Sequence, residues 1–263
     1  MFIKGLNITV GADPEFFVAD KGVLVSAHNL IKGDKMNPFK VDNGAVQVDG
    51  IAAEFNIDPS NSYEEFQGNI DSVMETLSEM IGDKELLNAV SVDFDEKFME
   101  SIPQENLELG CEADYNGWTG QENVKPEAGN MMRTAGGHVH IGGFYDGNAF
   151  DTDHFKTCMR MSRLMDEELG VYSILWDKDD KRRSMYGKAG CFRPKKYGME
   201  YRTLSNAWLY DKNKIKFVYN AVERVIERMF RGEDASPDVQ DVINKSDRSS
   251  PMFNDNKLVG SWC

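Results

Sequence analysis

The segment Thr-Ala-Gly-Gly-His-Val-His-Ile-Gly-Gly at residues 134–143 places two of the chain's four histidines two residues apart in a short β-like run bordered by glycines. Side chains alternate between the two faces of a strand, so His138 and His140 are expected on one face, with Val139 and Ile141 on the other. The glycines leave room for a ligand or a neighbouring backbone to come close. The segment therefore predicts a strand with one chemically active face.

Three more strand-like segments carry polar residues among apolar neighbours. Asp13 and Glu15 are two residues apart in Gly-Ala-Asp-Pro-Glu-Phe-Phe, Glu200 and Arg202 are two apart in Gly-Met-Glu-Tyr-Arg-Thr-Leu-Ser, and Glu54 lies within Ile-Ala-Ala-Glu-Phe-Asn-Ile. Half-exposed strands alternate polar and apolar residues in any case. This set, however, contains almost no Lys, Thr or Ser, so it predicts one sheet face lined with carboxylate, imidazole and guanidinium groups.

The rest of the pattern predicts hairpins and amphipathic helices. Residues 6–26 and 45–57 read as β-hairpins with turn signals at their centres. Apolar residues at helical spacing follow potential capping residues at Ser62, Asp151 and Asp211. Strands and helices in this arrangement indicate an α+β fold. We expect one catalytic domain over residues 1–235, followed by a tail over residues 236–263 that contains a short helix.

A long polar loop at residues 101–132 interrupts this pattern, apart from a short strand-like run from Leu107 to Cys111. Long loops inside compact domains are often functional. Glu112, Asp114 and Asn116 repeat the spacing of two residues within it. The loop is therefore a candidate source of substrate contacts.

The four cysteines form no Cys-x-x-Cys pair, and we interpret them as reduced thiols without the nearby histidine of a nucleophile. His154, in the first turn of the second expected helix, is expected to be exposed. No apolar run approaches the roughly 18 residues that span a bilayer, and the start of the chain lacks a signal-peptide pattern. We therefore expect a cytoplasmic protein that does not bind membranes.

The net charge of −14 argues against duplex nucleic acid as a partner, because phosphates would be repelled at long range. Positive charge nevertheless gathers in one stretch, where residues 181–202 contain eight basic residues and a single acid, Glu200. The stretch includes the glycine-punctuated loop Tyr-Gly-Lys-Ala-Gly at residues 186–190, which lacks the residue order of a P-loop. We expect an anion to bind there.

Ligand chemistry narrows the choice of metal. A set dominated by oxygen atoms favours Mg²⁺ or Mn²⁺. Zinc hydrolases and cupins also use His-x-His on a strand, but the hydrolases continue with Asp and His, and cupins need a nearby Glu and a later His. Here the chain continues with Ile141-Gly142-Gly143, so zinc is disfavoured. Cations beside a basic loop indicate a bound polyphosphate and phosphoryl transfer.

The ordered motifs resemble those of the glutamine synthetase and glutamate–cysteine ligase superfamily, and within it most closely the phage-type COOH–NH2 ligases. The resemblance rests on Gly-Ala-Asp-Pro-Glu-Phe, Gly-Gly-His-Val-His-Ile-Gly, Tyr-Gly-Lys-Ala-Gly and Glu-Tyr-Arg-Thr-Leu-Ser, which are spread over residues 11 to about 208. The larger relatives often have two Glu where this chain has Asp13 and Glu15. They also draw three Glu from the region where only Glu54 is obvious.

The resemblance implies a curved antiparallel sheet with metals on its concave face and helices on the other face. It implies ATP as a substrate and amide formation between a carboxylate and an amine, in the host cytoplasm if the chain is phage-encoded. Carried over by motif, the metal ligands would be Asp13, Glu15, Glu54, His138 and Glu200, for two or three Mg²⁺ or Mn²⁺ ions. Arg202 would contact the γ-phosphate, and Arg183, Arg193 and Lys188 would bind phosphates or the substrate carboxylate. His140, which faces the same way as His138, is expected to contact phosphate or substrate. Asp114 is the candidate general base because it lies in the long loop, and a surface acid is the other interpretation of it.

Two other functions stay open. A phosphotransferase of the guanidino-kinase type shares the implied sheet architecture, although such kinases favour nucleotide sites dominated by arginine. A catalytically silent, phage-associated binding protein would share the fold, but loss of function would be expected to remove an expensive cluster of buried charge first. The residues indicate neither the two substrates nor the oligomeric state.

Overall fold

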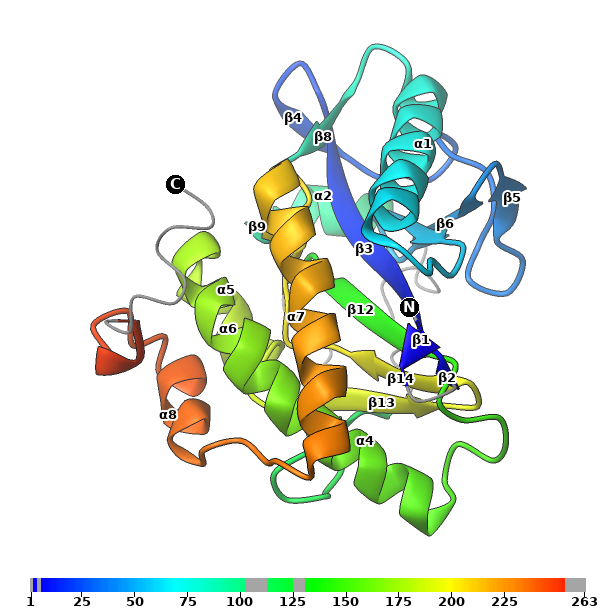
Figure 1. The fold of residues 1–263 in the computed structure, drawn as a ribbon. Helices are drawn as coiled ribbons and strands as arrows, with labels where there is room; N and C mark the ends of the chain where they lie inside the picture. The colour runs from blue at the N-terminus through cyan, green and yellow to red at the C-terminus, as the bar shows by residue number, and fades with distance from the viewer. Residues whose placement is uncertain (1, 4–5, 103–112, 125–130, 254–263) are drawn as a thin grey trace.

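The computed structural model describes residues 2–3, 6–102, 113–124 and 131–253. Helices α1 (Tyr63–Ile81), α4 (Thr152–Met165) and α7 (Lys212–Arg231) lie over one face of a large antiparallel sheet to which ten of the described strands belong (Figure 1). Helix α2 (Glu96–Ser101) packs near Phe17 of the opposite face. Across the sheet the main path runs β10 (Tyr115–Asn116), β13 (Cys191–Lys195), β14 (Gly198–Tyr201), β12 (Gly137–Gly142), β3 (Thr9–Asp20), β7 (Ala52–Ile57), β6 (Gly44–Asp49) and β5 (Phe39–Val41), while β4 (Val23–Val25) and β8 (Glu85–Leu87) pair with β3.

This arrangement confirms the predicted α+β class and both hairpins. Two smaller antiparallel pairs join β1 (Phe2–Ile3) with β2 (Leu6–Asn7), and β9 (Ser91–Asp93) with β11 (Met132–Thr134). The strand expected from Leu107 to Cys111 lies outside the described residues, as does Glu112.

The three expected amphipathic helices are present, and two begin with side-chain caps. Ser62 Oγ accepts a hydrogen bond from the Glu65 amide at 3.2 Å, and the Asp211 carboxylate accepts one from the Asn213 amide at 2.8 Å. Asp151 occupies the cap position of its helix without such a bond. The helices are α1 (Tyr63–Ile81), α2 (Glu96–Ser101), α4 (Thr152–Met165), α5 (Val171–Trp176), α6 (Asp180–Met185), α7 (Lys212–Arg231) and α8 (Asp238–Asn244), with a π-helical segment at Asp166–Gly170 and 3-10 turns at Asn206–Trp208 and Pro251–Phe253.

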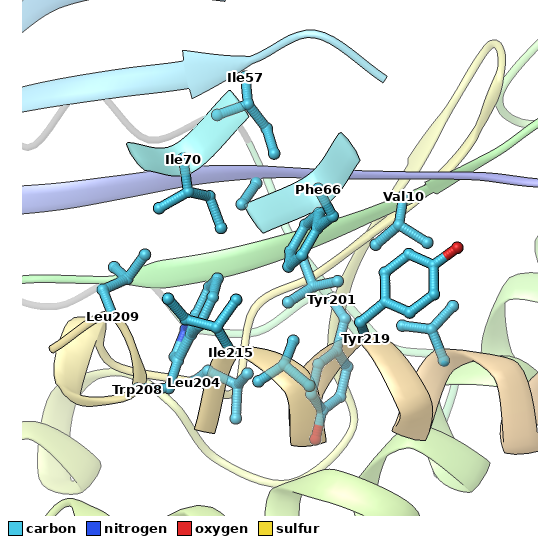
Figure 2. Packing of buried hydrophobic residues seen from close by; sticks show 14 of the residues in the cluster. Val10, Ile57, Phe66, Ile70, Tyr201, Leu204, Trp208, Leu209, Ile215 and Tyr219 are labelled. Atoms are coloured by element: carbon cyan, nitrogen blue, oxygen red, sulfur yellow. The ribbon is translucent and has the colours of Figure 1, made fainter. Parts of the chain in front are cut away.

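The main hydrophobic core fills the space between this helical layer and the sheet. Figure 2 shows Phe66 of α1 beside Trp208, and their rings stack with centroids 6.1 Å apart. Val10 of β3 and Tyr219 of α7 belong to the same cluster. Burial of each large apolar side chain contributes roughly 1.5–3 kcal/mol. Because alternate residues of β3 face the core, the residues between them, such as Asp13, are directed to the opposite face.

The last described helix packs on the same body. Helix α8 lies in the expected tail, where Val239, Val242 and Ile243 form a small buried cluster with Val171 and Ile174 of α5. The boundary at residue 235 stays a prediction. In the described ranges no helix combines the length and apolar character that crossing a membrane requires.

Candidate active site

Strand register brings the motif residues together on the sheet face opposite the main core. His138 of β12 lies directly across from Asp13 of β3, and His140 lies directly across from Glu200 of β14. The two histidines are two residues apart, so both point away from Val139 and Ile141, which are fully buried in the core. Three adjacent strands thus build one polar cluster from segments far apart in the sequence.

Ligand atoms of Asp13, His140 and Glu200 all lie within 4.8 Å of one another, as in a cation site. His140 Nε2 is 3.1 Å from one Asp13 oxygen, and His138 Nδ1 is 3.3 Å from the other. His138 Nδ1 is also 3.5 Å from Glu200 Oε1. Among the described residues, Asp13 Oδ1 and His140 Nε2 are buried without a well-formed hydrogen bond. Two buried polar atoms without a hydrogen-bond partner, both in one cluster, fit a bound divalent cation.

His140 is one of the three residues whose ligand atoms converge, whereas the sequence motifs predicted His138 as the metal ligand. His140 Nδ1 lies 2.5 Å from the Tyr197 hydroxyl, which leaves Nε2 directed at Asp13. A fixed partner on one ring nitrogen orients the other toward a metal. Both imidazoles therefore reach the carboxylate pair, and their geometry favours His140 as a ligand.

Glu200 is fully buried and surrounded by cationic groups. Its carboxylate lies 3.0 Å from Lys195 Nζ and 3.2 Å from Arg193 Nη1, and it also accepts a hydrogen bond from Arg202 Nη1. Desolvation by burial raises the pKa of Glu200, but Arg202, His140 and the other cations outweigh it and hold the pKa well below its ordinary value. Glu200 is therefore an anion at neutral pH.

Opposed charges also set the protonation of the neighbouring pair. Burial acts to raise the pKa of Asp13, yet the attraction of His140 and His138 brings that pKa below its ordinary value. For His140, burial acts to lower the pKa, and Asp13 outweighs it so that the net shift is upward. A cation bound at Asp13 would take the place of the proton on His140.

A second group of polar side chains extends along the same face. Glu15 of β3 lies directly across from Glu54 of β7, which lies directly across from Gln47 of β6. Gln47 Nε2 donates to Glu54 Oε2 at 2.7 Å, and the Gly136 amide donates to Glu15 Oε2 at 2.8 Å. Burial, followed by the negative charges of Asp13 and Glu15, raises the pKa of Glu54 well above its ordinary value. Such crowding of carboxylates is relieved by a cation.

Arg202 connects the cluster to Asp114, in the part of the long loop that the structure describes. Arg202 Nε lies 3.2 Å from Asp114 Oδ2, and the Cys191 thiol donates to the same oxygen at 3.2 Å. Asn123 Nδ2 donates to Asp114 Oδ1 at 2.9 Å. Burial, followed by Asp114, raises the pKa of Cys191 well above its ordinary value, so this thiol acts as a hydrogen-bond donor rather than a nucleophile.

An open cleft of about 840 Å³, counted with the solvent at its mouth, adjoins the cluster. Glu15, His138, Arg202 and Asp114 line its polar part. Its other walls come mainly from the turn between β6 and β7, from β11, from α6 and from the start of the glycine-punctuated loop. The residues that line these walls include Phe17, Lys35, Asp49, Ile51, Met132, Arg133, Arg182, Met185 and Tyr186. The cleft is a candidate substrate site because polar side chains converge on its wall next to the cation cluster.

Two of the predicted residues are not brought to the cluster. Arg183 is 3% exposed, and its guanidinium donates to the Gly187 carbonyl at 2.9 Å and to Ser173 Oγ at 3.2 Å. Lys188 has an exposed side chain, while its carbonyl accepts from Thr203 Oγ1. The neighbour Arg182 lines the cleft instead, held by the Thr203 and Leu204 carbonyls. Helix α6 turns adjacent arginines to different sides, which the run of basic residues does not reveal.

Three residues that complete the cluster were not predicted from the sequence. Lys195 and Tyr197 lie at the β13–β14 turn, and Gln47 lies on β6. Gln47 pairs with Glu54 across the predicted hairpin turn, so pairing positions across that hairpin would have found it. Lys195 is two residues beyond Arg193, which pairs with Glu200, so the same reasoning on β13 and β14 would have placed Lys195 on the face of Glu200. No comparable signal marked Tyr197, because its partner His140 lies on a different hairpin.

The expectation that His154 is exposed was wrong. Its side chain is buried, with Nε2 3.1 Å from the Lys195 carbonyl and its ring stacked 3.7 Å from that of Tyr145. It also lies 3.5 Å from Cys158 Sγ, so this cysteine has a histidine neighbour after all. Burial raises the pKa of the Cys158 thiol to about 12, which leaves the pair structural.

An antiparallel sheet carrying buried carboxylates, imidazoles and arginines next to an open cleft defines an enzyme-like site suited to cations and anionic substrates. Residues 114–244 match the model of the family described as Phage phiEco32-like COOH.NH2 ligase-type 2. Over that span the chain is a domain of this family, whose name identifies a carboxylate–amine ligase. The span includes His138, His140, Glu200 and Arg202, whereas Asp13, Glu15 and Glu54 precede it. None of the curated proteins compared with the chain matches it.

Proposed function

We propose that the protein is an ATP-dependent carboxylate–amine ligase that uses Mg²⁺ or Mn²⁺ and forms an amide through an acyl phosphate. The observation that carries this proposal is the convergence of Asp13, His140 and Glu200 within 4.8 Å, with Arg193 and Arg202 alongside. A cation site with arginines beside it is suited to neutralising a polyphosphate. The family name adds that the products are joined carboxylates and amines.

The residues divide into two groups by their surroundings. Asp13, Glu200 and His140, with His138 in reach, would hold one cation, and Glu15 with Glu54 would hold a second. Bound divalent cations would neutralise the phosphates of ATP and stabilise charge on the transferred group. The sheet curvature that the resemblance implies would place both groups on a concave face.

The first step activates the carboxylate, whose charge repels amines and whose oxygen is an impossible leaving group. A carboxylate oxygen attacks the γ-phosphorus of ATP, a new O–P bond forms, the bond to the bridging oxygen breaks and ADP leaves. Arg202, already fixed by Glu200 and Asp114, would contact the γ-phosphoryl oxygens, while Arg193 and Lys195 approach from the β13–β14 hairpin.

In the second step the amine nitrogen attacks the acyl carbon and inorganic phosphate leaves. The attacking nitrogen must lose a proton, and Asp114, which lines the cleft beside Arg202, is the proposed acceptor. The cleft would hold the carboxylate substrate, the amine, or part of each.

The test follows the oxygen atoms and does not need the natural amine. The protein is incubated with ATP, Mg²⁺ and a pool of ¹⁸O-labelled carboxylates, with hydroxylamine as a small nucleophile. We expect ADP, ¹⁸O in the released phosphate and a hydroxamate, all seen by mass spectrometry. Glu200→Gln should abolish them, whereas the exposed variant Glu227→Gln on α7 should not.

Three results would contradict the proposal. A stable phosphorylated acceptor without hydroxamate would indicate a phosphotransferase. Absence of both ATP turnover and Mg²⁺-dependent nucleotide binding would indicate a binding protein. Activity of Glu200→Gln within a few-fold of the unmodified protein would remove Glu200 from the cation site.

A further inference from the structure

A fully buried carboxylate lies behind the site, on the helical side of the sheet. Asp166 begins the π-helical segment that follows α4, and none of its surface is exposed. Its Oδ2 accepts from Trp118 Nε1 at 2.6 Å, and its Oδ1 accepts from the Tyr201 hydroxyl at 2.7 Å. Thr203 Oγ1, which donates to the Lys188 carbonyl at 3.0 Å, lies 3.5 Å from the same Oδ1. The Gly190 amide is a further donor to the Asp166 carboxylate.

These donors belong to the three segments that carry the site. Tyr201 and Thr203 alternate with Glu200 and Arg202, so their anchoring sets the position of the backbone from which those two side chains project. Trp118 lies in the turn after β10, four residues beyond Asp114. Gly190 ends the glycine-punctuated loop, and its φ of +73° places its Cα where a Cβ would lie 2.6 Å from Trp118 Cδ1.

The packing around Asp166 leaves little freedom. A Cβ on Gly170 would lie 2.4 Å from the Tyr201 hydroxyl oxygen and 3.3 Å from Asp166 Oδ1. Tyr201 lies among the core residues between sheet and helices in Figure 2. Burial, followed by Asp166, raises the pKa of Tyr201, so its hydroxyl stays protonated and donates. One carboxylate therefore holds strand, turn and loop in a single arrangement.

We propose that Asp166, in its ionised form, is the positioning residue that aligns Glu200, Arg202 and Asp114 for cation and phosphate binding. This inference rests on the proposed function of the cluster. A buried anion stabilised only by neutral donors costs free energy relative to a neutral group. Its presence at the junction of the three site segments is explained by the alignment that three convergent donors, from Trp118, Tyr201 and Gly190, provide.

Asp166 can be ionised at neutral pH because its hydrogen-bond donors offset part of the free-energy cost of burying the carboxylate. Burial raises the pKa of Asp166 to about 6, with Gly190, Trp118, Tyr201 and Thr203 opposing that rise. The titratable group that contacts it from β14 is Tyr201, and Arg183 of α6 acts electrostatically on that tyrosine. At pH 7.5 the carboxylate accepts all its bonds; when protonated, it must direct one O–H toward a donor.

The first readout is the indole N–H resonance of Trp118, assigned with Trp118→Phe in ¹H–¹⁵N spectra of the full chain. A short bond to a carboxylate places this resonance downfield at pH 7.5, and it should move upfield with a midpoint near pH 6. In Asp166→Asn it should lie upfield at every pH. An unchanged resonance in that variant would overturn the assignment of the contact.

The second readout is Mn²⁺ affinity with and without ATP, measured by electron paramagnetic resonance. Asp166→Asn should bind Mn²⁺ at least tenfold more weakly, and its NH2 group, which replaces an oxygen facing a donor, should also lower the melting temperature. The matched control is Val225→Ala, which creates a cavity beside the buried face of α7. This variant should have a lower melting temperature and an unchanged affinity for Mn²⁺.

A purely structural role would make Asp166→Asn lose stability, with Mn²⁺ affinity retained, and would overturn the inference. Native Mn²⁺ affinity in Asp166→Asn would do the same. If the unmodified protein binds Mn²⁺ but forms no hydroxamate, the ligase proposal fails, while the role of Asp166 is still decided by the two readouts. If it binds no Mn²⁺, both fail.

Discussion

Glu15 and Glu54 lie directly across from each other on adjacent antiparallel strands, two carboxylates in one pairing position of a buried sheet face. Like charges in this position destabilise a sheet. Burial is the main cause that raises the pKa of both groups above the ordinary value; Asp49 adds to the rise of both, and Asp13 and Glu15 add to that of Glu54. The cation-free fold is therefore under electrostatic strain that a divalent ion would relieve.

We expect Mn²⁺ or Mg²⁺ to raise the melting temperature, and Glu54→Gln to reduce this increase. An ion at 100 times its dissociation constant stabilises the fold by roughly 2.7 kcal/mol. The variant should also melt higher than the unmodified protein when EDTA is present, because one of the facing charges is gone. Calorimetry with and without Mn²⁺ measures both effects. Glu75→Gln, on the exposed side of α1, is the control that should change neither.

The same two carboxylates predict how stability depends on pH without metal. Their folded pKa values lie above the ordinary 4.5, so the folded protein retains protons that the unfolded chain releases. Their contribution is fully present below pH 4.5 and is lost as pH rises through the folded values. In Glu54→Gln this loss should be smaller, as measured by urea unfolding in EDTA at a series of pH values. An equal loss in the variant would mean that Glu54 is not the titrating group.

Removing the Tyr197 hydroxyl should weaken cation binding and have little effect on the stability of the fold. Tyr197→Phe deletes the 2.5 Å contact with His140 Nδ1 and frees the ring to rotate away from Asp13. Loss of such an orienting partner typically lowers metal affinity by about 10- to 100-fold. Titration with Mn²⁺ by calorimetry measures the change. Tyr145→Phe, which removes a hydroxyl bonded to Asp151 away from the cluster, should bind Mn²⁺ normally; a matching loss there would make the effect nonspecific.

The sequence predicted the sheet face, because a spacing of two residues is translated directly into geometry on a strand. Asp13, His138 and Glu200 met as expected once antiparallel register was added. The basic residues were harder to place. Arg182 and Arg183 are adjacent, and only the start and direction of α6 decide that Arg182 lines the cleft while Arg183 bonds to Gly187 and Ser173.

Contacts between residues far apart in the sequence could not be predicted from local patterns, for a different reason. Asp166 follows the apolar stripe of α4 and belongs to none of the sequence motifs, and its hydrogen bonds come from Trp118 and Tyr201, which lie 48 and 35 residues away. Such pairings are set by how α4 crosses the sheet, and the local sequence contains no record of that crossing angle.

Close packing around the glycines of the central motif leads to a prediction about the stability of the fold. A Cβ on Gly137 would lie 2.4 Å from the Ser205 carbonyl oxygen and 2.7 Å from Trp208 Nε1, so Gly137→Ala should destabilise the protein by roughly 1–3 kcal/mol or more. Gly68 on α1 has open space around it, and Gly68→Ala should stabilise by about 0.5–1 kcal/mol. Urea unfolding of both variants tests whether close packing explains the Gly-Gly-His sequence. Equal effects of the same sign would refute it.

Substitution of Asp114 is expected to affect the two chemical steps differently. Its carboxylate touches Arg202 and Cys191, while Arg202 is separately held by Glu200. Asp114→Asn should therefore preserve transfer of ¹⁸O from the carboxylate to phosphate when hydroxylamine, which needs little help from a base, is the nucleophile. With an amino acid amine, which reaches the site as an ammonium ion, amide formation should fall by about 10²–10⁴-fold at neutral pH. Cys191→Ala removes the neighbouring thiol but leaves the carboxylate, and should retain most amide formation. Equal losses with hydroxylamine and amine in Asp114→Asn would show that this residue positions Arg202 instead of accepting a proton.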